Sequence, residues 1–101
     1  MCGILGSNFI SNNFSNALEL LNSRGPDYNA VLKIKEKEFG HTRLSIIDLD
    51  DEANQPMVFD DILIVFNGEI YNYKQLIMDE DLYCKTASHT EVIIRLYQKY
   101  G

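Results

Sequence analysis

Cys2 is the residue whose position most directly suggests chemistry, because it follows the initiator Met1. Removal of Met1, which a small second residue generally permits, would leave a thiol and a free α-amine on one residue. The ordinary pKa of an α-amine is about 7.7–8.0, so near pH 7 part of it is neutral and can take the thiol proton. Cys2 would then be an activated nucleophile without a catalytic histidine. The alternative is that Cys2 is simply a small buried hydrophobic residue.

The pair Asn67–Gly68 is a second candidate, because it stands between the apolar run 62–66 and Glu69. A side-chain amide beside a glycine N–H can form an oxyanion hole for a tetrahedral intermediate. Asn-Gly between apolar segments is also the commonest tight hairpin turn, and local sequence alone favours the turn.

Arg43 is a third candidate, at the expected end of a strand with apolar residues close behind it. A guanidinium on an apolar floor suits bidentate binding of a substrate carboxylate, whereas an ion pair with Asp48 or Asp50 is the alternative that local sequence favours. His41 is the histidine that a Cys–His catalytic pair could use. We rank it below the α-amine, because Cys2 is expected in a strand rather than at a helix start that would lower its pKa.

Composition indicates one small globular domain around these residues. The chain has 101 residues, of which 46% are hydrophobic and 24% charged, and a formal net charge of −6 without any basic run. Nucleic acid and an anionic membrane are therefore unexpected partners. No secretion signal and no stretch near the roughly 20 apolar residues of a spanning helix is present, so we expect a cytoplasmic protein with free thiols. The cysteines and histidines lack the paired spacing of a zinc site, so no metal is expected.

Hydrophobic spacing predicts the elements that must position the candidates. Strands are expected over 2–7, 30–34, 38–44 and 62–66, with a weak strand over 82–84. Residues 35–37 form the expected hairpin turn, 48–56 a polar loop, and 62–66 a central strand covered on both faces. Helices are expected over 12–23, 73–78 and 89–100, and the last begins with a capping box over 88–91. The fold class is α+β with a largely antiparallel sheet.

Six segments, in this order, resemble the glutaminase domain of class II glutamine amidotransferases, in particular of glutamine-hydrolysing asparagine synthases. They are Met1-Cys2-Gly3-Ile4, Arg24-Gly25-Pro26-Asp27, His41-Thr42-Arg43-Leu44-Ser45-Ile46-Ile47-Asp48, Gln55-Pro56-Met57, Asn67-Gly68-Glu69-Ile70-Tyr71-Asn72 and Glu91-Val92-Ile93. The resemblance extends over residues 1–101. It implies an Ntn-hydrolase fold, an αββα sandwich of two antiparallel sheets between helical layers, with the nucleophile at the start of a central strand.

The resemblance also implies roles for individual residues. Cys2 would attack the side-chain amide of glutamine, while Asn67 and Gly68 would hold the oxyanion. Arg43 would bind the α-carboxylate, Glu69 would help to fix the α-amino end, and the segment 24–27 would be a structured turn near the site. The substrate-binding residues implied in this way are Arg43, Leu44, Ile46, Ile47, Asn67, Gly68, Glu69 and His89.

His89 departs from the family pattern. The family commonly has Ser-Asp-x-Glu before the last helix, where this chain has Ser88-His89-Thr90-Glu91. A neutral imidazole could still accept one hydrogen bond from the substrate ammonium, whereas a protonated one would repel it. We therefore expect weaker glutamine binding that worsens below the pKa of His89.

The family's glutaminase domain is roughly twice as long as this chain. We therefore expect residues 1–101 to be its N-terminal part, without the synthetase domain that would bind ATP and Mg, and we expect no cofactor in this chain. The expected partners are glutamine, a synthetase domain or subunit that takes up ammonia, and further copies of the chain through uncovered sheet edges. The alternative is a truncated, non-catalytic remnant or binding module with an incomplete site.

Overall fold

The chain folds into the α+β class with antiparallel sheets, as the sequence predicts. The computed structural model describes residues 1–45 and 51–101. Its elements are β1 (Gly3–Ser7), α1 (Phe14–Glu19), β2 (Tyr28–Ile34), β3 (Lys37–Arg43), the 3-10 helix η1 (Asp51–Ala53), β4 (Met57–Phe59), β5 (Ile62–Ile64), α2 (Tyr73–Asp79) and α3 (His89–Tyr100). Among the described residues, no helix is long and apolar enough to cross a membrane.

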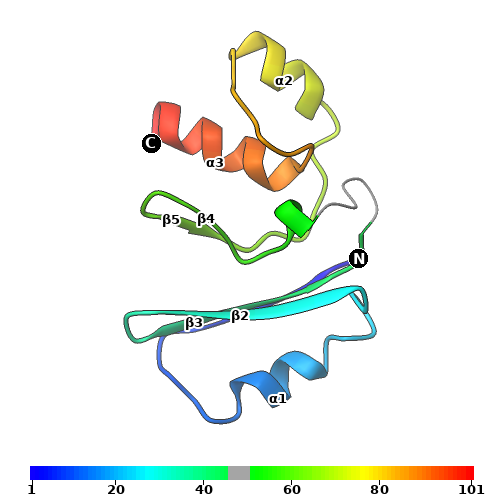
Figure 1. Ribbon diagram of the computed structural model, residues 1–101, viewed down its shortest axis with the longest axis vertical. Helices are drawn as coiled ribbons and strands as arrows, with labels where there is room; N and C mark the ends of the chain where they lie inside the picture. The colour runs from blue at the N-terminus through cyan, green and yellow to red at the C-terminus, as the bar shows by residue number, and fades with distance from the viewer. Residues whose placement is uncertain (46–50) are drawn as a thin grey trace.

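The elements form four layers (Figure 1). Helix α1 covers one face of a sheet with strand order β1-β3-β2, the two-stranded sheet β4-β5 follows, and α3 lies beyond it with α2 on the far side. This helix–sheet–sheet–helix order is the sandwich expected from the Ntn-hydrolase resemblance. Strand β1 pairs only with β3 in the described chain, so β3 is the central strand and β1 an edge strand. The expectation that the strand following Cys2 is central is therefore wrong for the described residues.

The β2–β3 hairpin is tighter than predicted. Ile34 pairs directly with Lys37, so only Lys35 and Glu36 form the turn. Lys35 has a φ of 56°, and a left-handed residue lets the chain reverse within two residues. Lys37 therefore belongs to β3 rather than to the turn.

Helix α1 is shorter than the predicted 12–23. After Glu19 the backbone continues in tighter turns, in which Leu21 N–H donates to Leu18 O and Arg24 N–H donates to Leu21 O, both over 2.9 Å. The spacing of Phe14, Leu18 and Leu21 predicts an apolar stripe along this helix, and Phe14 and Leu18 are indeed buried against the sheet. The last part of the predicted helix becomes the approach to the turn at 24–27.

The predicted strand 62–66 is confirmed only over residues 62–64, and its predicted central position is wrong. Strand β5 has three half-buried residues and pairs, within the described chain, only with β4. Strand β4 was not predicted, because its three residues directly follow the polar stretch 48–56. The two strands are joined through Asp60, whose φ of 54° permits the tight turn.

The weak strand expected over 82–84 is also absent. The next two residues, Lys85 and Thr86, donate their backbone N–H groups to the Glu91 carboxylate, over 2.8 and 2.7 Å, rather than to a strand. Within the predicted segment, Leu82 N–H donates to Ile77 O of α2 over 2.9 Å. The segment is therefore held by the helix before it and is followed by a loop that Glu91 fixes, and these contacts override local β-propensity.

Helix α3 has the predicted bounds and packs against β4 and β5. Helical spacing predicts one apolar face of Val92, Leu96 and Tyr100 and an adjoining one of Ile93 and Tyr97, and the buried side agrees with this only in part. Val92 and Ile94 are fully buried, whereas Tyr97 and Tyr100 are 58% and 66% exposed. Helical spacing identified the helix, but it did not distinguish large aromatic residues at the C-terminal end from the aliphatic residues that contact the sheet.

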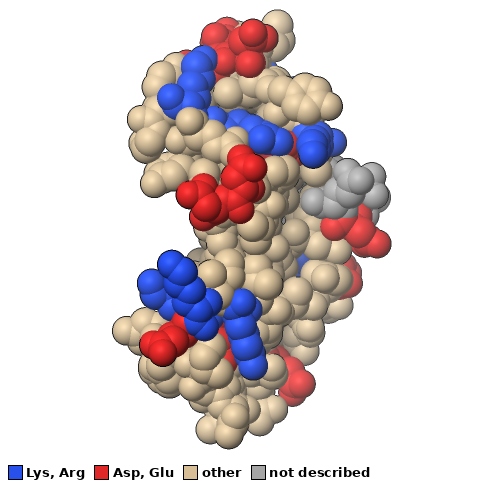
Figure 2. All heavy atoms as spheres, turned by 60° about the vertical axis from the view of Figure 1, so that its left-hand side comes forward, with Lys and Arg blue, Asp and Glu red and all other residues tan. Residues whose placement is uncertain are grey.

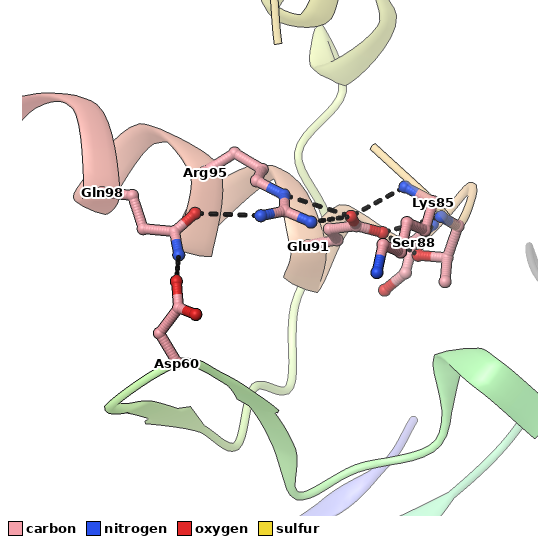
Figure 3. Close-up of polar contacts among 7 residues, drawn as sticks. Asp60, Lys85, Ser88, Glu91, Arg95 and Gln98 are labelled. Atoms are coloured by element: carbon pink, nitrogen blue, oxygen red, sulfur yellow. Dashed lines mark hydrogen bonds and ion pairs between the residues drawn. The ribbon is translucent and has the colours of Figure 1, made fainter. Parts of the chain in front are cut away.

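The capping box at the start of α3 is modified. Ser88 Oγ accepts from Thr90 N–H over 3.1 Å, one position earlier than predicted, and Ser88 N–H goes to Thr86 Oγ1. The Glu91 side chain does not accept a hydrogen bond from Ser88 N–H. It binds the preceding loop and forms an ion pair with Arg95 Nη2 over 3.0 Å, as Figure 3 shows. The carboxylate of Glu91 therefore fixes the loop that leads to Ser88 and His89.

Replacing Glu91 by glutamine is expected to lower the free energy of unfolding by about 3 kcal/mol at pH 7, because Arg95 and the loop N–H groups lose a buried anionic partner. Burial alone would raise the pKa of Glu91, but the hydrogen bonds from Lys85, Thr86 and Arg95 outweigh it and lower the pKa below 4.5. The stabilisation is therefore present above pH 4.5 and is lost as the pH falls through the lowered pKa.

Urea unfolding of wild type and Glu91→Gln at pH 7 and at pH 3 would measure this difference. The gap between the two proteins should narrow at the lower pH. Glu80→Gln is the matched control, because Glu80 pairs with Lys99 on the surface and its loss should change stability little. Equal losses in both variants would contradict the assignment.

Candidate active site

A cavity of about 400 Å³ lies where the end of β3, the segment 66–69 and the N-terminus of α3 meet. Its size is that of a small-molecule site. It brings together all the sequence-predicted site residues that the structure describes, namely Cys2, Arg43, Leu44, Asn67, Gly68, Glu69 and His89. The predicted Ile46 and Ile47 lie outside the described residues.

Cys2 is half-buried at the edge of this cavity, directly before β1. Leu44 N–H donates to Cys2 Sγ over 3.3 Å, and the Cys2 carbonyl accepts from Arg24 Nε over 3.2 Å. This N–H group points at the sulfur and orients it in the cavity. The backbone of Leu44, which the resemblance placed in the pocket lining, therefore contacts the candidate nucleophile itself.

The start of β1 is fixed by Gly3 and Thr42. Gly3 N–H donates to the buried Thr42 Oγ1, which in turn donates to Leu21 O, both over 3.1 Å. A Cβ atom on Gly3 would lie 2.6 Å from Thr42 Oγ1 and 2.8 Å from Leu21 Cβ. Only glycine therefore fits at this position. The contribution of Thr42 was not predicted, because nothing in the sequence indicates which hydroxyl lies opposite Gly3.

Gly3→Ala is expected to destabilise the protein by about 1–3 kcal/mol and to displace Cys2, because the added methyl group overlaps two packed side chains. Gly6→Ala is the matched control in the same strand, since a Cβ there would meet only Phe39 Cδ1 at 4.0 Å. Thermal unfolding and the alkylation rate of Cys2 would report the two effects. If Gly3→Ala behaved like Gly6→Ala in both measurements, the close packing around Gly3 would be wrong.

The segment 24–27 is a structured turn beside the site, as predicted. Asp27 N–H donates to Arg43 O over 3.0 Å, and Asp27 Oδ2 accepts from Ser45 N–H over 2.8 Å. A Cβ atom on Gly25 would lie 2.3 Å from Thr42 O, so the turn approaches β3 as closely as a glycine allows. These contacts brace the end of β3, which carries Arg43 and Leu44.

Asn67–Gly68 does not form the hairpin turn that local sequence favours. That turn needs a positive φ at both positions, and neither residue has one. The chain instead leaves β5 and passes along the cavity towards α2. The Phe66 ring lies against Gly68, where a Cβ would be 2.9 Å from Phe66 Cζ. A larger residue at position 68 would therefore collide with the Phe66 ring unless that ring moved, and Gly68 itself lines the cavity.

Arg43 is buried in the cavity wall, where the side-chain amide of Asn54 contacts its guanidinium. Its Nη1 donates to Asn54 Oδ1. Asp48 and Asp50, the partners expected from local sequence, lie outside the described residues. A guanidinium in the wall of the cavity suits the binding of an anionic group there.

His41 is not paired with Cys2. It is fully buried, and neither of its ring nitrogens has a hydrogen-bond partner of ordinary geometry among the described residues. The pKa of His41 is lowered to about 4, mainly by burial and to a smaller extent by the Arg43 charge, while the Phe66 backbone opposes the shift. Such a group is a weak base at neutral pH. The Cys–His pair that we ranked below the α-amine is therefore not formed.

His89 lies in the cavity wall and is buried, with an exposed fraction of 8%. Its Nδ1 accepts from Ile70 N–H over 2.9 Å, and its ring lies against the Tyr73 ring with centroids 4.3 Å apart. Burial lowers the pKa of His89, while the nearby Glu69 charge opposes the shift. His89 is therefore neutral near pH 7.

The hydrogen bond at Nδ1 corrects the expectation that neutral His89 could accept a hydrogen bond from the substrate ammonium. With Nδ1 accepting from Ile70, the proton of neutral His89 is on Nε2, which can only donate. His89 therefore does not accept a hydrogen bond from a substrate ammonium, as the sequence had suggested. The sequence could not reveal the backbone donor that decides the tautomer.

The cavity also contains residues to which the sequence assigned no role, among them Gln55, Tyr71, Ser88 and Thr90. Gln55 belongs to one of the six recognised segments, which was the available sign of its importance. Within residues 1–45 and 51–101, no group of three or more His, Cys, Asp and Glu side chains is arranged to hold a metal ion.

Comparison with known proteins identifies the chain. Residues 1–101 match the glutamine amidotransferase domain. The chain is 39% identical to glutamine-hydrolysing asparagine synthetase 1 of Bacillus subtilis over 81% of its length, and 34% identical to glutamine-hydrolysing asparagine synthetase 2 of Oryza sativa subsp. japonica over 100%. It is 40% identical to amidase chyE of Penicillium rubens over 84%. The chain spans 14%, 19% and 13% of these three relatives. This chain belongs to the glutamine amidotransferase family.

Proposed function

We propose that this chain hydrolyses the side-chain amide of glutamine, with Cys2 as the nucleophile, and releases ammonia for an amidation of the asparagine synthase type. The observation that carries the proposal is that Cys2, Arg43, Asn67 and Gly68 line one cavity. A nucleophile, a carboxylate-binding cation and two oxyanion donors are the groups that amide hydrolysis of an amino acid needs. The names of the two asparagine synthetase relatives, which specify glutamine hydrolysis, support glutamine as the substrate.

The first step is acyl transfer. After removal of Met1, the α-amine of Cys2 takes the thiol proton, and Sγ attacks the side-chain carbonyl carbon of glutamine. The carbonyl oxygen becomes an oxyanion that accepts hydrogen bonds from Asn67 Nδ2 and the Gly68 N–H. The C–N bond breaks as the protonated α-amine gives its proton to the leaving nitrogen. Ammonia leaves, and the glutamyl group remains bound to Cys2 as a thioester.

The second step is hydrolysis of the thioester. The α-amine, now neutral again, takes a proton from water, and the resulting hydroxide equivalent attacks the thioester carbonyl at the same oxyanion donors. The C–S bond breaks, the proton returns to Sγ, and glutamate leaves. Arg43 holds the α-carboxylate throughout, and Glu69 faces the ammonium, while ammonia passes to a synthetase domain or subunit that supplies the acceptor.

His89→Asp is expected to lower the KM for glutamine by about tenfold at pH 7, because a carboxylate can bind the ammonium that the Nε2–H of His89 cannot. Since burial lowers the pKa of His89 below 6.5, the wild-type imidazole becomes charged only below that pH. The wild-type KM should then rise as the pH falls, because a cationic His89 repels the ammonium.

Steady-state assays from pH 5 to pH 8 would check this, with His89→Asn as the uncharged control. The control should show neither the lower KM nor the rise at acidic pH. If His89→Asp gained no apparent affinity for glutamine, the role given to position 89 would be wrong.

The proposal as a whole is tested by the purified chain itself. Intact mass gives the fraction of molecules that begin at Cys2, and glutamate and ammonia are measured from glutamine in the same sample. We expect equal amounts of the two products, at a rate proportional to the fraction that lacks Met1. Turnover that is absent when Met1 is fully removed would overturn the proposal, and would favour a binding module that has kept the residues of the site without its activity.

A further inference from the structure

The side chain of Gln55 connects two walls of the cavity. Gln55 is 7% exposed, its Oε1 accepts from Phe66 N–H over 2.6 Å, and its Nε2 donates to Thr90 Oγ1 over 2.9 Å. Both ends of one buried amide are therefore used, one by the segment that leads to Asn67 and the other by the first turn of α3. Gln55 is part of a segment that the sequence analysis singled out, yet the proposed mechanism gives it no role.

The bond to Phe66 replaces a backbone bond of the sheet. The β4–β5 ladder has Met57 opposite Ile64 as its last pair on this side. Gln55 lies two residues before Met57, and Phe66 lies two residues after Ile64, so a longer antiparallel ladder would place them opposite each other. The side-chain oxygen of Gln55 takes the Phe66 N–H instead. The ladder stops here, and the chain can leave the sheet along the cavity.

The two partners of Gln55 adjoin the groups of the site. Phe66 directly precedes Asn67 and Gly68, whereas Thr90 directly follows His89, and all of them line the cavity. One rigid side-chain amide therefore sets the position of the oxyanion segment relative to the N-terminus of α3. Buried polar groups that are satisfied at both ends specify such a position more strictly than apolar packing does.

We infer that Gln55 is a positioning residue that holds the Asn67–Gly68 oxyanion donors in place relative to Cys2. The inference rests on the proposed function. Gln55 touches neither substrate nor the reacting atoms in the mechanism, so it acts through the backbone of Phe66. Its loss should misplace the donors in the transition state, while glutamine binding by Arg43 is retained.

Three substitutions distinguish the contributions of the two hydrogen bonds of the Gln55 bridge, which are those to Phe66 and to Thr90. Gln55→Leu removes both hydrogen bonds at similar volume, Thr90→Val removes only the Nε2 partner, and Thr90→Ser keeps the hydroxyl as the conservative rescue. Gln75→Leu is the matched control, because Gln75 is an exposed glutamine of α2 that bonds only Asp79 among the described contacts.

We expect kcat to fall about 10²-fold in Gln55→Leu and about tenfold in Thr90→Val, with KM within about threefold of wild type in both. Thr90→Ser and Gln75→Leu should keep the wild-type kcat. The rate of Cys2 alkylation by iodoacetamide should not change in any variant, because the nucleophile is not affected. If Gln55→Leu does not fold, Thr90→Val and its serine rescue decide the question.

Amide hydrogen exchange gives a readout that does not need turnover. The Phe66 N–H should exchange faster in Gln55→Leu and remain protected in Gln75→Leu. An inactive wild type would overturn the proposed function, and the exchange of the Phe66 and Gly68 amides would still test the bridge. The inference is overturned if the Thr90→Val and Gln55→Leu proteins keep kcat within about threefold of wild type, or if Phe66 exchange is the same in Gln55→Leu as in wild type.

Discussion

Replacing Cys2 by alanine is expected to reduce glutamine hydrolysis by on the order of 10⁴-fold or more, because no other group described in the cavity can form the thioester. The structure supports this size of effect. Leu44 N–H donates to Cys2 Sγ over 3.3 Å, and the pKa of His41, lowered to about 4, makes it a poor substitute base near neutral pH. Ammonia release from glutamine by wild type and variant would measure the loss.

Cys84→Ala is the matched control for this substitution. Cys84 is also a free, half-buried cysteine, but it lies outside the cavity, and burial raises the pKa of its thiol. Its replacement should leave turnover unchanged. Activity that survived in Cys2→Ala but not in Cys84→Ala would assign the nucleophile to the other thiol and contradict the mechanism.

Asn67→Ala is expected to lower kcat by about 10²–10³-fold with little change in KM, because it removes one donor that acts only on the oxyanion. The remaining Gly68 N–H would still support slow turnover. Asn67 lines the cavity beside Glu69, and its backbone does not form a turn that would explain its presence structurally. Steady-state kinetics on glutamine would separate the two constants.

Asn72→Ala is the control for the loss of an asparagine amide. Asn72 precedes α2, makes no side-chain capping bond, and lies outside the cavity. It should therefore keep kcat and KM. A rise in KM alone for Asn67→Ala would mean that Asn67 binds the ground state and is not an oxyanion donor.

The parts of the fold that could be predicted from the sequence were those with strong local patterns. Helix α3 has the predicted bounds, because an N-cap serine and helical spacing agree there. The length and central position predicted for strand β5 were wrong, because five consecutive apolar residues do not reveal how many strands pair with them or what packs on their faces. The strand predicted over 82–84 is absent for another reason, since Leu82 N–H donates to Ile77 O of the preceding helix and the next residues, Lys85 and Thr86, donate to Glu91 of the following one.

Local sequence singled out Cys2, Asn67–Gly68 and Arg43 as candidates, but their roles in one site were predicted from the resemblance. Local sequence favoured a hairpin turn for Asn67–Gly68, which the structure does not form, and Asn67, Gly68 and Arg43 all line the cavity. The ion pair of Arg43 with Asp48 or Asp50, which local sequence also favoured, involves residues outside the described part of the chain. Their catalytic and binding roles stay predictions. The tautomer of His89 and the bridge made by Gln55 depend on contacts between residues far apart in the chain, and no spacing rule in the sequence encodes such contacts.

Figure 2 shows how charge is distributed on one face of the molecule. Lysines and arginines form small groups close to acidic residues on that face, which is also hollowed between its two halves. Ile4 and Val58 are 46% and 45% exposed, so apolar side chains of both sheets are open to solvent in the described structure. Self-association through such surfaces stays a prediction.

The most direct test of the account is to treat the chain with diazo-oxo-norleucine, a glutamine-like electrophile, and to map the modified residue by mass spectrometry. We expect the adduct on Cys2 of molecules that lack Met1, formed faster than any adduct on Cys84 and suppressed by glutamine. Labelling of Cys2 no faster than Cys84, or labelling that glutamine does not slow, would contradict the claim that this cavity is a glutaminase site.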